Sequence, residues 1–117
     1  MAKATSEEFP HELRIVRSSD YRTLYQAGRK IHCDSFVLFS RANAMGHPRL
    51  GITVSRKIGD AVVRNRVKRL FREIFRRSVR EIPEPLDIVV NAKSGCAGAS
   101  YRKLSAEFLD AAHKLCR

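Results

Sequence analysis

The residues of this sequence best suited to chemistry are a concentrated set of cations. From Arg56 to Arg80 the chain has ten Lys or Arg residues and only two acids, Asp60 and Glu73, which is a net charge of +8. The rest of the 117 residues has 13 basic and 10 acidic residues, so this segment holds most of the total charge of +11. Such an excess requires an anionic partner, which is nucleic acid, an acidic protein or an anionic membrane.

The basic segment follows helical spacing, and we predict a helix over 60–82. At about 100° per residue, its apolar side is centred on four residues: Val63, Val67, Leu70 and Ile74. Its far side carries Asn65, Arg69, Arg72, Arg76 and Arg80. A solvated face would be buffered by acids at i,i+4 spacing, whereas Glu73 stands alone among eight basic residues from Arg64 onward. Because arginine favours planar contacts with phosphate, the stripe indicates nucleic-acid binding rather than an ordinary charged face.

Arg64 is the exception, because it projects close to the apolar side. We therefore expect the first turn to extend beyond the sheet, where Arg64, Asn65 and Arg66 would form a local cluster. A helix lying on a membrane would need its apolar side free. Here that side is needed to cover a sheet, so we predict no membrane partner.

Residues that could catalyse a reaction are scattered. Four aspartates occur singly in different predicted elements: Asp34, Asp60, Asp87 and Asp110. A stand-alone nuclease would need a carboxylate cluster for metal or an acid–base pair, and no histidine has an evident partner. The three cysteines are widely spaced and form no CxxC pair. We predict no catalytic residue and no metal site.

A short helix is predicted over 19–27. Tyr21, Leu24 and Tyr25 recur at i, i+3 and i+4, after a capping sequence and before Gly28. A closing amphipathic helix is predicted from Tyr101 to Leu115. Both helices would position the basic segment by packing on a sheet.

Strands are expected at 29–34, 36–39, 50–55 and 86–92. The turn-like link Asn43–Pro48 predicts that 36–39 and 50–55 form an antiparallel hairpin. The order α-β-β(-β)-α-β-α predicts an α+β fold, a single-domain sandwich in which three helices cover a small mixed sheet of about four strands.

The domain organisation expected is a flexible N-terminal tail, 1–12, followed by one RNA-binding α/β domain, 13–117. The chain is too short for two useful cores. No apolar run approaches the roughly 18 residues of a membrane span, and the N-terminus is not a secretory signal, so a cytoplasmic protein is expected.

The segment from Ser55 to Leu70, SRKIGDAVVRNRVKRL, resembles the RNR signature of the bacterial ribonuclease P protein family. The resemblance continues through 20–28, 36–39 and 50–55, and covers roughly 13–115. It implies a non-catalytic protein subunit of an endoribonuclease that removes the 5′ leader of precursor tRNA. It also implies that the catalyst is an RNA subunit using Mg²⁺, with one protein per RNA. For the fold, it implies that strand 49–55, helix 60–82 and strand 86–92 make a left-handed crossover, whereas such crossovers are usually right-handed.

The resemblance assigns binding of the catalytic RNA to the motif and its flanks, and the basic stripe extends that surface: Arg56, Lys57, Arg64, Asn65, Arg66, Lys68, Arg69, Arg72 and Arg76. It assigns a cleft for the precursor leader to Tyr21, Tyr25 and Phe39, whose rings can stack on any base. An i,i+4 aromatic pair also fits a hydrophobic core. Composition alone leaves open a ribosomal or general double-stranded-RNA binder, and only the signature argues against it.

Overall fold

The computed structural model describes residues 11–82 and 84–115, and it confirms the predicted fold class. The helices are α1 (Ser18–Ala27), α2 (Ala61–Ser78) and α3 (Tyr101–Leu115), and the strands are β1 (Arg29–His32), β2 (Phe36–Ala42), β3 (Arg49–Thr53) and β4 (Leu86–Ala92). Four short 3-10 turns accompany them: η1 (His11–Leu13), η2 (Arg56–Ile58), η3 (Val79–Glu81) and η4 (Ser94–Gly98). Of the predicted tail 1–12, all but the last two residues lie outside the described residues, as do Pro83 and Cys116.

The four strands form one mixed sheet in the order β1-β2-β4-β3. The predicted hairpin of β2 with β3 is therefore wrong. The segment Asn43–Pro48 does turn the chain, with Gly46 at a positive φ of 84°, but β4 lies between the two strands. The physical reason is that β4 is a nearly continuous apolar run buried on both faces, which is typical of a central strand with a partner on each side. The true hairpin joins β1 to β2.

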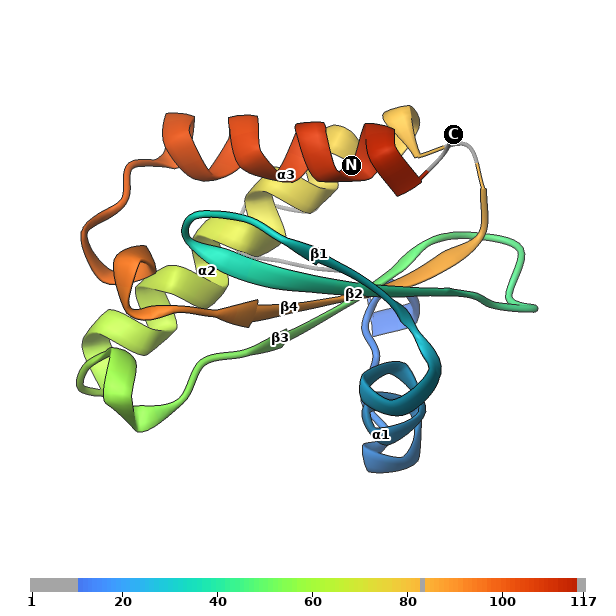
Figure 1. Ribbon diagram of the computed structural model, residues 1–117, viewed down its shortest axis with the longest axis horizontal. Helices are drawn as coiled ribbons and strands as arrows, with labels where there is room; N and C mark the ends of the chain where they lie inside the picture. Colours follow the sequence, from blue (N-terminus) through green and yellow to red (C-terminus); the bar gives the residue numbers. More distant parts are fainter. Residues whose placement is uncertain (1–10, 83, 116–117) are drawn as a thin grey trace, which may run out of the picture.

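Helices cover both faces of the sheet, with α2 and α3 on one side and α1 on the other (Figure 1). The main core lies under α2 and α3, where Phe36 and Phe71 meet edge-to-face with ring centroids 5.1 Å apart. A smaller core under α1 consists of Ile15, Leu24, Phe39 and Val89. Because α1 is short, it covers only one end of its face, and the aromatic side chains of interest lie at its border.

Helix α2 begins where Asp60 caps it, since the Asp60 carboxylate accepts a hydrogen bond from the Val63 N–H at 3.0 Å. Its buried side chains are Val67, Phe71, Ile74, Phe75 and Ser78. The apolar side predicted for this helix included Leu70, but the buried side lies further round the helix. Phe71 and Phe75 are buried instead, because they offer more apolar area than Leu70. The β3-α2-β4 unit joins two adjacent parallel strands. The left-handed sense of this crossover stays a prediction from the resemblance.

Candidate nucleic-acid interface

Tyr21 fastens α1 to the sheet. It is half-buried, and its hydroxyl donates to the carbonyl oxygen of Ile15 at 3.2 Å. The ring lies so close to Gly51 of β3 that a Cβ added there would be 2.6 Å from the Tyr21 hydroxyl oxygen. Glycine at position 51 is thus needed for this contact. Burial raises the pKa of the Tyr21 phenol, so it stays neutral at physiological pH.

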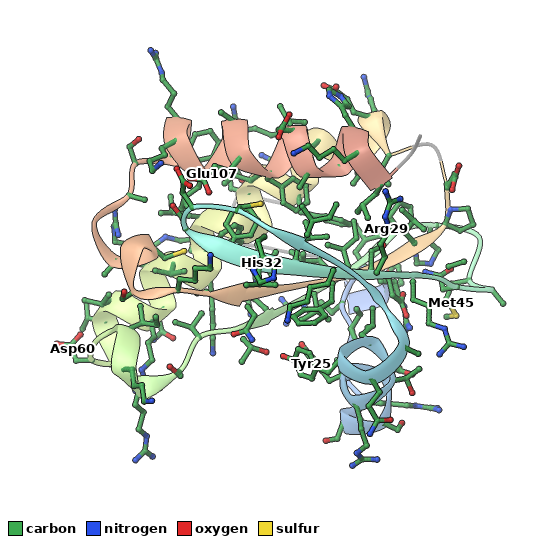
Figure 2. The ribbon with its side chains drawn as sticks, in the orientation of Figure 1. Tyr25, Arg29, His32, Met45, Asp60 and Glu107 are labelled. Carbon is green, nitrogen blue, oxygen red and sulfur yellow. The ribbon has the colours of Figure 1, made fainter. Side chains whose placement is uncertain are left out.

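Tyr25 presents an exposed ring on a fixed support. Tyr25 is 39% exposed. Its hydroxyl nevertheless lies 2.8 Å from Thr53 Oγ1, and its ring meets the Phe39 ring edge-to-face with the centroids 4.9 Å apart. Figure 2 shows Tyr25 projecting from α1 beneath the strands. Phe39 itself is only 8% exposed. The alternative of an i,i+4 aromatic pair in the core therefore fits Tyr21 in part and does not fit Tyr25.

An open groove of about 510 Å³ runs along this side of α1. Its lining residues are Ser18, Tyr21, Arg22, Tyr25, Gln26 and Thr53. Two of the three predicted cleft residues line it, while Phe39 supports Tyr25 from below. Sequence reasoning missed Arg22 and Gln26, although each follows a tyrosine on the same helical face and the spacing i, i+3, i+4, i+7, i+8 from Ser18 would have found them.

The basic stripe of α2 is less uniform than its sequence. Asn65, Arg69 and Arg76 are exposed, and so are Arg56 and Lys57 in η2. Glu73 accepts hydrogen bonds from two arginines, at 2.7 Å from Arg76 and 2.6 Å from Arg77. The hydrogen bond from Arg76 is the largest cause that lowers the pKa of the Glu73 carboxyl, and together with the bond from Arg77 it outweighs the opposing effect of desolvation. The one glutamate therefore neutralises part of the C-terminal half and leaves the first half as the stronger positive surface.

Arg72 lies at the edge of the sheet rather than on the far side of the helix, where projection placed it. It lines a second hollow of about 250 Å³ together with Lys68, Arg14 and Tyr21. Burial, and next the charge of Arg14, lower the pKa of the Arg72 guanidinium. Gathered cations of this kind favour a phosphate. Because Tyr21 also lines the groove of α1, the cations and the aromatic groove adjoin.

The first-turn cluster predicted for the RNR motif does not form. Arg64 Nε donates to the carbonyl oxygen of Gly59 at 3.2 Å. The Arg66 guanidinium donates instead to two carbonyls of a distant loop, those of Ala97 at 3.1 Å and Ala99 at 3.3 Å. Backbone carbonyls thus hold the two arginines at separate places, and Asn65 between them is exposed.

Asp87 and Asp20 hold elements of the fold together through Arg49. Asp87 is 8% exposed and accepts two hydrogen bonds from Arg49, at 2.8 and 2.7 Å, and one from Asn43 at 2.8 Å. Arg49 also reaches Asp20 of α1 at 3.6 Å. Within 11–82 and 84–115, no three His, Cys, Asp or Glu side chains are close enough to hold a metal ion, and no helix is long and apolar enough to span a membrane.

Comparisons with known proteins agree on one family. Residues 9–116 match the family described as Ribonuclease P. The chain is 42% identical over 112 residues to the "Ribonuclease P protein component" of Desulfovibrio desulfuricans, covering 92% of this chain and 86% of that protein. It is 42% identical over 98 residues to the protein of the same name from Klebsiella pneumoniae, covering 83% and 82%.

Solved structures show the same likeness. The ribonuclease P protein of Thermotoga maritima superposes with a TM-score of 0.80 at 32% identity, covering 86% of this chain and 96% of that one. A Staphylococcus aureus ribonuclease P protein mutant, described as defective in mRNA degradation activity, gives a TM-score of 0.79 at 31% identity, covering 90% and 88%.

Proposed function

The chain belongs to the ribonuclease P protein family, and from that premise we propose that it gives the ribonucleoprotein two adjoining RNA-binding surfaces. It is the protein subunit of a tRNA-processing endoribonuclease. One surface is the basic face of η2 and α2, for the catalytic RNA. The other is the groove of α1, for the 5′ leader of precursor tRNA.

The basic face supports docking on folded RNA. Arg56, Lys57 and Arg69 are exposed, and Asn65 adds a hydrogen-bonding side chain among them. Guanidinium groups bind phosphate oxygens in pairs, which suits a rigid RNA surface. Glu73 weakens the field toward the end of the helix, so the docking surface is centred on its first half.

The groove supports binding of a single strand. Tyr25 offers an exposed ring already fixed by Thr53 and Phe39, so little conformational entropy is lost when a base stacks on it. Arg22 lines the same groove, and Arg72 lies in the adjoining hollow. A strand leaving the groove would thus meet cations for its backbone. This adjacency is the observation that carries the proposal, because it lets one protein hold the leader beside the catalytic RNA.

The chemistry falls to the RNA subunit in this proposal. Mg²⁺ would be held mainly by that RNA, and one protein would bind each RNA. The role of this chain is to hold the leader, which favours precursor over mature tRNA because only the precursor has one.

The test is cleavage of precursor tRNA by the cognate RNA subunit, with and without this chain. We expect the protein to increase kcat/KM at low Mg²⁺, and Tyr25→Ala and Arg69→Ala each to reduce the increase. Arg102→Ala, which removes an exposed cation from α3, is the matched control and should keep it. Equal binding of unrelated double-stranded RNA with no effect on cleavage would instead indicate a general RNA binder.

A further inference from the structure

We propose that Arg66 is a positioning residue, which fixes the start of α2 by holding the loop Ser94–Ala99 rather than by neutralising an RNA phosphate. The inference rests on the proposed function, because the segment that it orients is the docking surface for the catalytic RNA. It divides the RNR motif into a residue that supports the surface and residues that touch the partner.

The contacts of Arg66 are those of a clamp. Its two terminal nitrogens donate separately, Nη1 to the Ala97 carbonyl at 3.1 Å and Nη2 to the Ala99 carbonyl at 3.3 Å. A guanidinium can span two carbonyls because its donors form a rigid fork, whereas a lysine ammonium is a single point. Both nitrogens at the end of the fork, the usual partners of a phosphate, therefore face the protein.

The loop that Arg66 holds is itself firmly seated. Cys96 is fully buried, and its thiol donates to the carbonyl oxygen of Ser35 at 3.0 Å. The Lys93 N–H donates to the same carbonyl at 2.9 Å. Ala99 is only 6% exposed, and its N–H donates to the Cys96 carbonyl at 3.2 Å. The clamp thus ties α2 to a buried anchor and not to a loose surface loop.

That anchor extends across the molecule. Ser35, in the turn between β1 and β2, donates both its N–H and its hydroxyl to the Glu107 carboxylate, at 2.9 and 2.8 Å. Glu107 lies on α3 and points toward this turn (Figure 2). The loop also packs against η2, which carries Arg56 and Lys57. Arg66 therefore sets how the exposed cations of η2 and of the first turns of α2 sit relative to the body of the protein.

Arg69 provides the contrast on the same helix. It is exposed, one turn further on, whereas Arg66 is half-buried. If each served as a phosphate contact, their removal would have equal effects on salt dependence, because each neutralised phosphate releases its own counterions. A clamp acts through geometry, so its loss weakens binding without changing the number of phosphates contacted.

The experiment uses the full chain and its cognate RNA subunit, with four variants: Arg66→Ala, Arg66→Lys, Arg69→Ala and Arg69→Lys. Affinity is measured over a range of salt at a temperature where circular dichroism shows each variant folded. Hydrogen exchange of the amides at 94–99 is followed in the free proteins. We expect Arg66→Ala to speed loop exchange and to weaken RNA binding, each by roughly ten-fold or more, with an unchanged salt slope.

The lysine variants separate geometry from charge. Arg66→Lys should lose nearly as much affinity as Arg66→Ala, whereas Arg69→Lys should retain most of it. Arg69→Ala should flatten the salt slope by about one unit and leave loop exchange unchanged. A slope flattened by Arg66→Ala, or full rescue by Arg66→Lys, would show a phosphate contact and overturn the inference. Unchanged affinity with only a lower melting temperature would also overturn it, because the residue would then be merely structural.

Two further results keep the outcomes distinct. If the affinity of the wild-type protein for the RNA subunit hardly changed with salt concentration, the proposed docking surface would be wrong, whether or not Arg66 holds the loop. Should Arg66→Ala not fold, NMR of the free wild-type protein decides: the Arg66 Nη protons should give separate, slowly exchanging signals, and those of Arg69 should not. Averaged signals for Arg66 would refute the clamp without any variant.

Discussion

Replacing Tyr25 with alanine should separate precursor tRNA from mature tRNA. Tyr25 is the more exposed of the two aromatic residues that line the groove, and removal of its ring takes away the surface on which a leader base would stack. The docking surface for the catalytic RNA lies on η2 and α2 and is untouched. We therefore expect the holoenzyme to assemble normally and to lose affinity only for the substrate that carries a leader.

The magnitude follows from the contacts of Tyr25. A base stacked on an aromatic side chain contributes roughly 1–3 kcal/mol, so precursor binding should weaken by about five- to hundred-fold. Alanine also loses the hydrogen bond to Thr53 and the edge-to-face contact with Phe39. Each contributes about 0.5–1.5 kcal/mol, which leaves a protein of ordinary stability folded.

The assay compares dissociation constants of the holoenzyme for precursor and mature tRNA, beside thermal unfolding of the free protein. Tyr25→Phe is the matched control. It keeps the ring but not the hydroxyl, so it should bind precursor within about two-fold of wild type while losing roughly 1 kcal/mol of unfolding free energy.

Two results would refute this reasoning. A folded Tyr25→Ala protein that loses precursor and mature tRNA equally would show that the residue does not contact the leader. An alanine variant that fails to fold, while Tyr25→Phe remains intact and binds normally, would show that the ring serves the core.

Four other outcomes are expected. Homogeneous protein without RNA should not cleave precursor tRNA; metal-dependent cleavage lost on mutating an aspartate would contradict this. Binding to the RNA subunit should fall with salt at a slope near −4 if about five phosphates are neutralised, and a titration at several salt concentrations measures it. Gly51→Ala should displace Tyr21, whose hydroxyl oxygen would be 2.6 Å from the new Cβ, and weaken precursor binding more than mature binding. Burial raises the pKa of the Cys96 thiol from 9.0 to about 11, so between these pH values the folded protein keeps a proton that the unfolded chain releases. The unfolding free energy of the protein should therefore fall as pH rises through that interval. A denaturant titration at several pH values should show a smaller fall for Cys96→Ala.

Local patterns were enough to predict the elements of the fold, and their pairing was not. The spacing of Tyr21, Leu24 and Tyr25 predicts α1, alternation predicts β3, and short apolar runs predict β2 and β4. The link at 43–48 is a genuine turn, but a turn does not state which strand lies beside the next. The run Leu86–Ala92, which is apolar except at Asp87 and Asn91, held part of that information, because a strand that reads as an apolar run is typically covered on both faces and lies inside the sheet.

The candidate surfaces were predictable to a similar depth. Residue type and helical spacing place Arg69 outward, since this depends only on its own helix, whereas the same spacing left a core position open for Tyr25 and only the resemblance indicated a cleft. The engagement of Arg66 with the carbonyls of Ala97 and Ala99 leaves no trace in residue types, because any residue supplies a carbonyl and the partners are 31 and 33 positions away. Arg72 was misplaced for a related reason: the side of α2 that faces the sheet was set by Phe71 and Phe75.

The central position of β4 also has a consequence for how the protein is made. During synthesis the β1–β2 hairpin is complete early, but β3 must wait for residues 86–92 before it has a neighbouring strand. The whole of α2 emerges from the ribosome during that interval, with its apolar side uncovered and its cations exposed. Pairing that depends on distant segments is slow to form. The nascent chain therefore passes through a stage in which this strongly basic helix also exposes its apolar side, and β4 must join the sheet before that side can be covered.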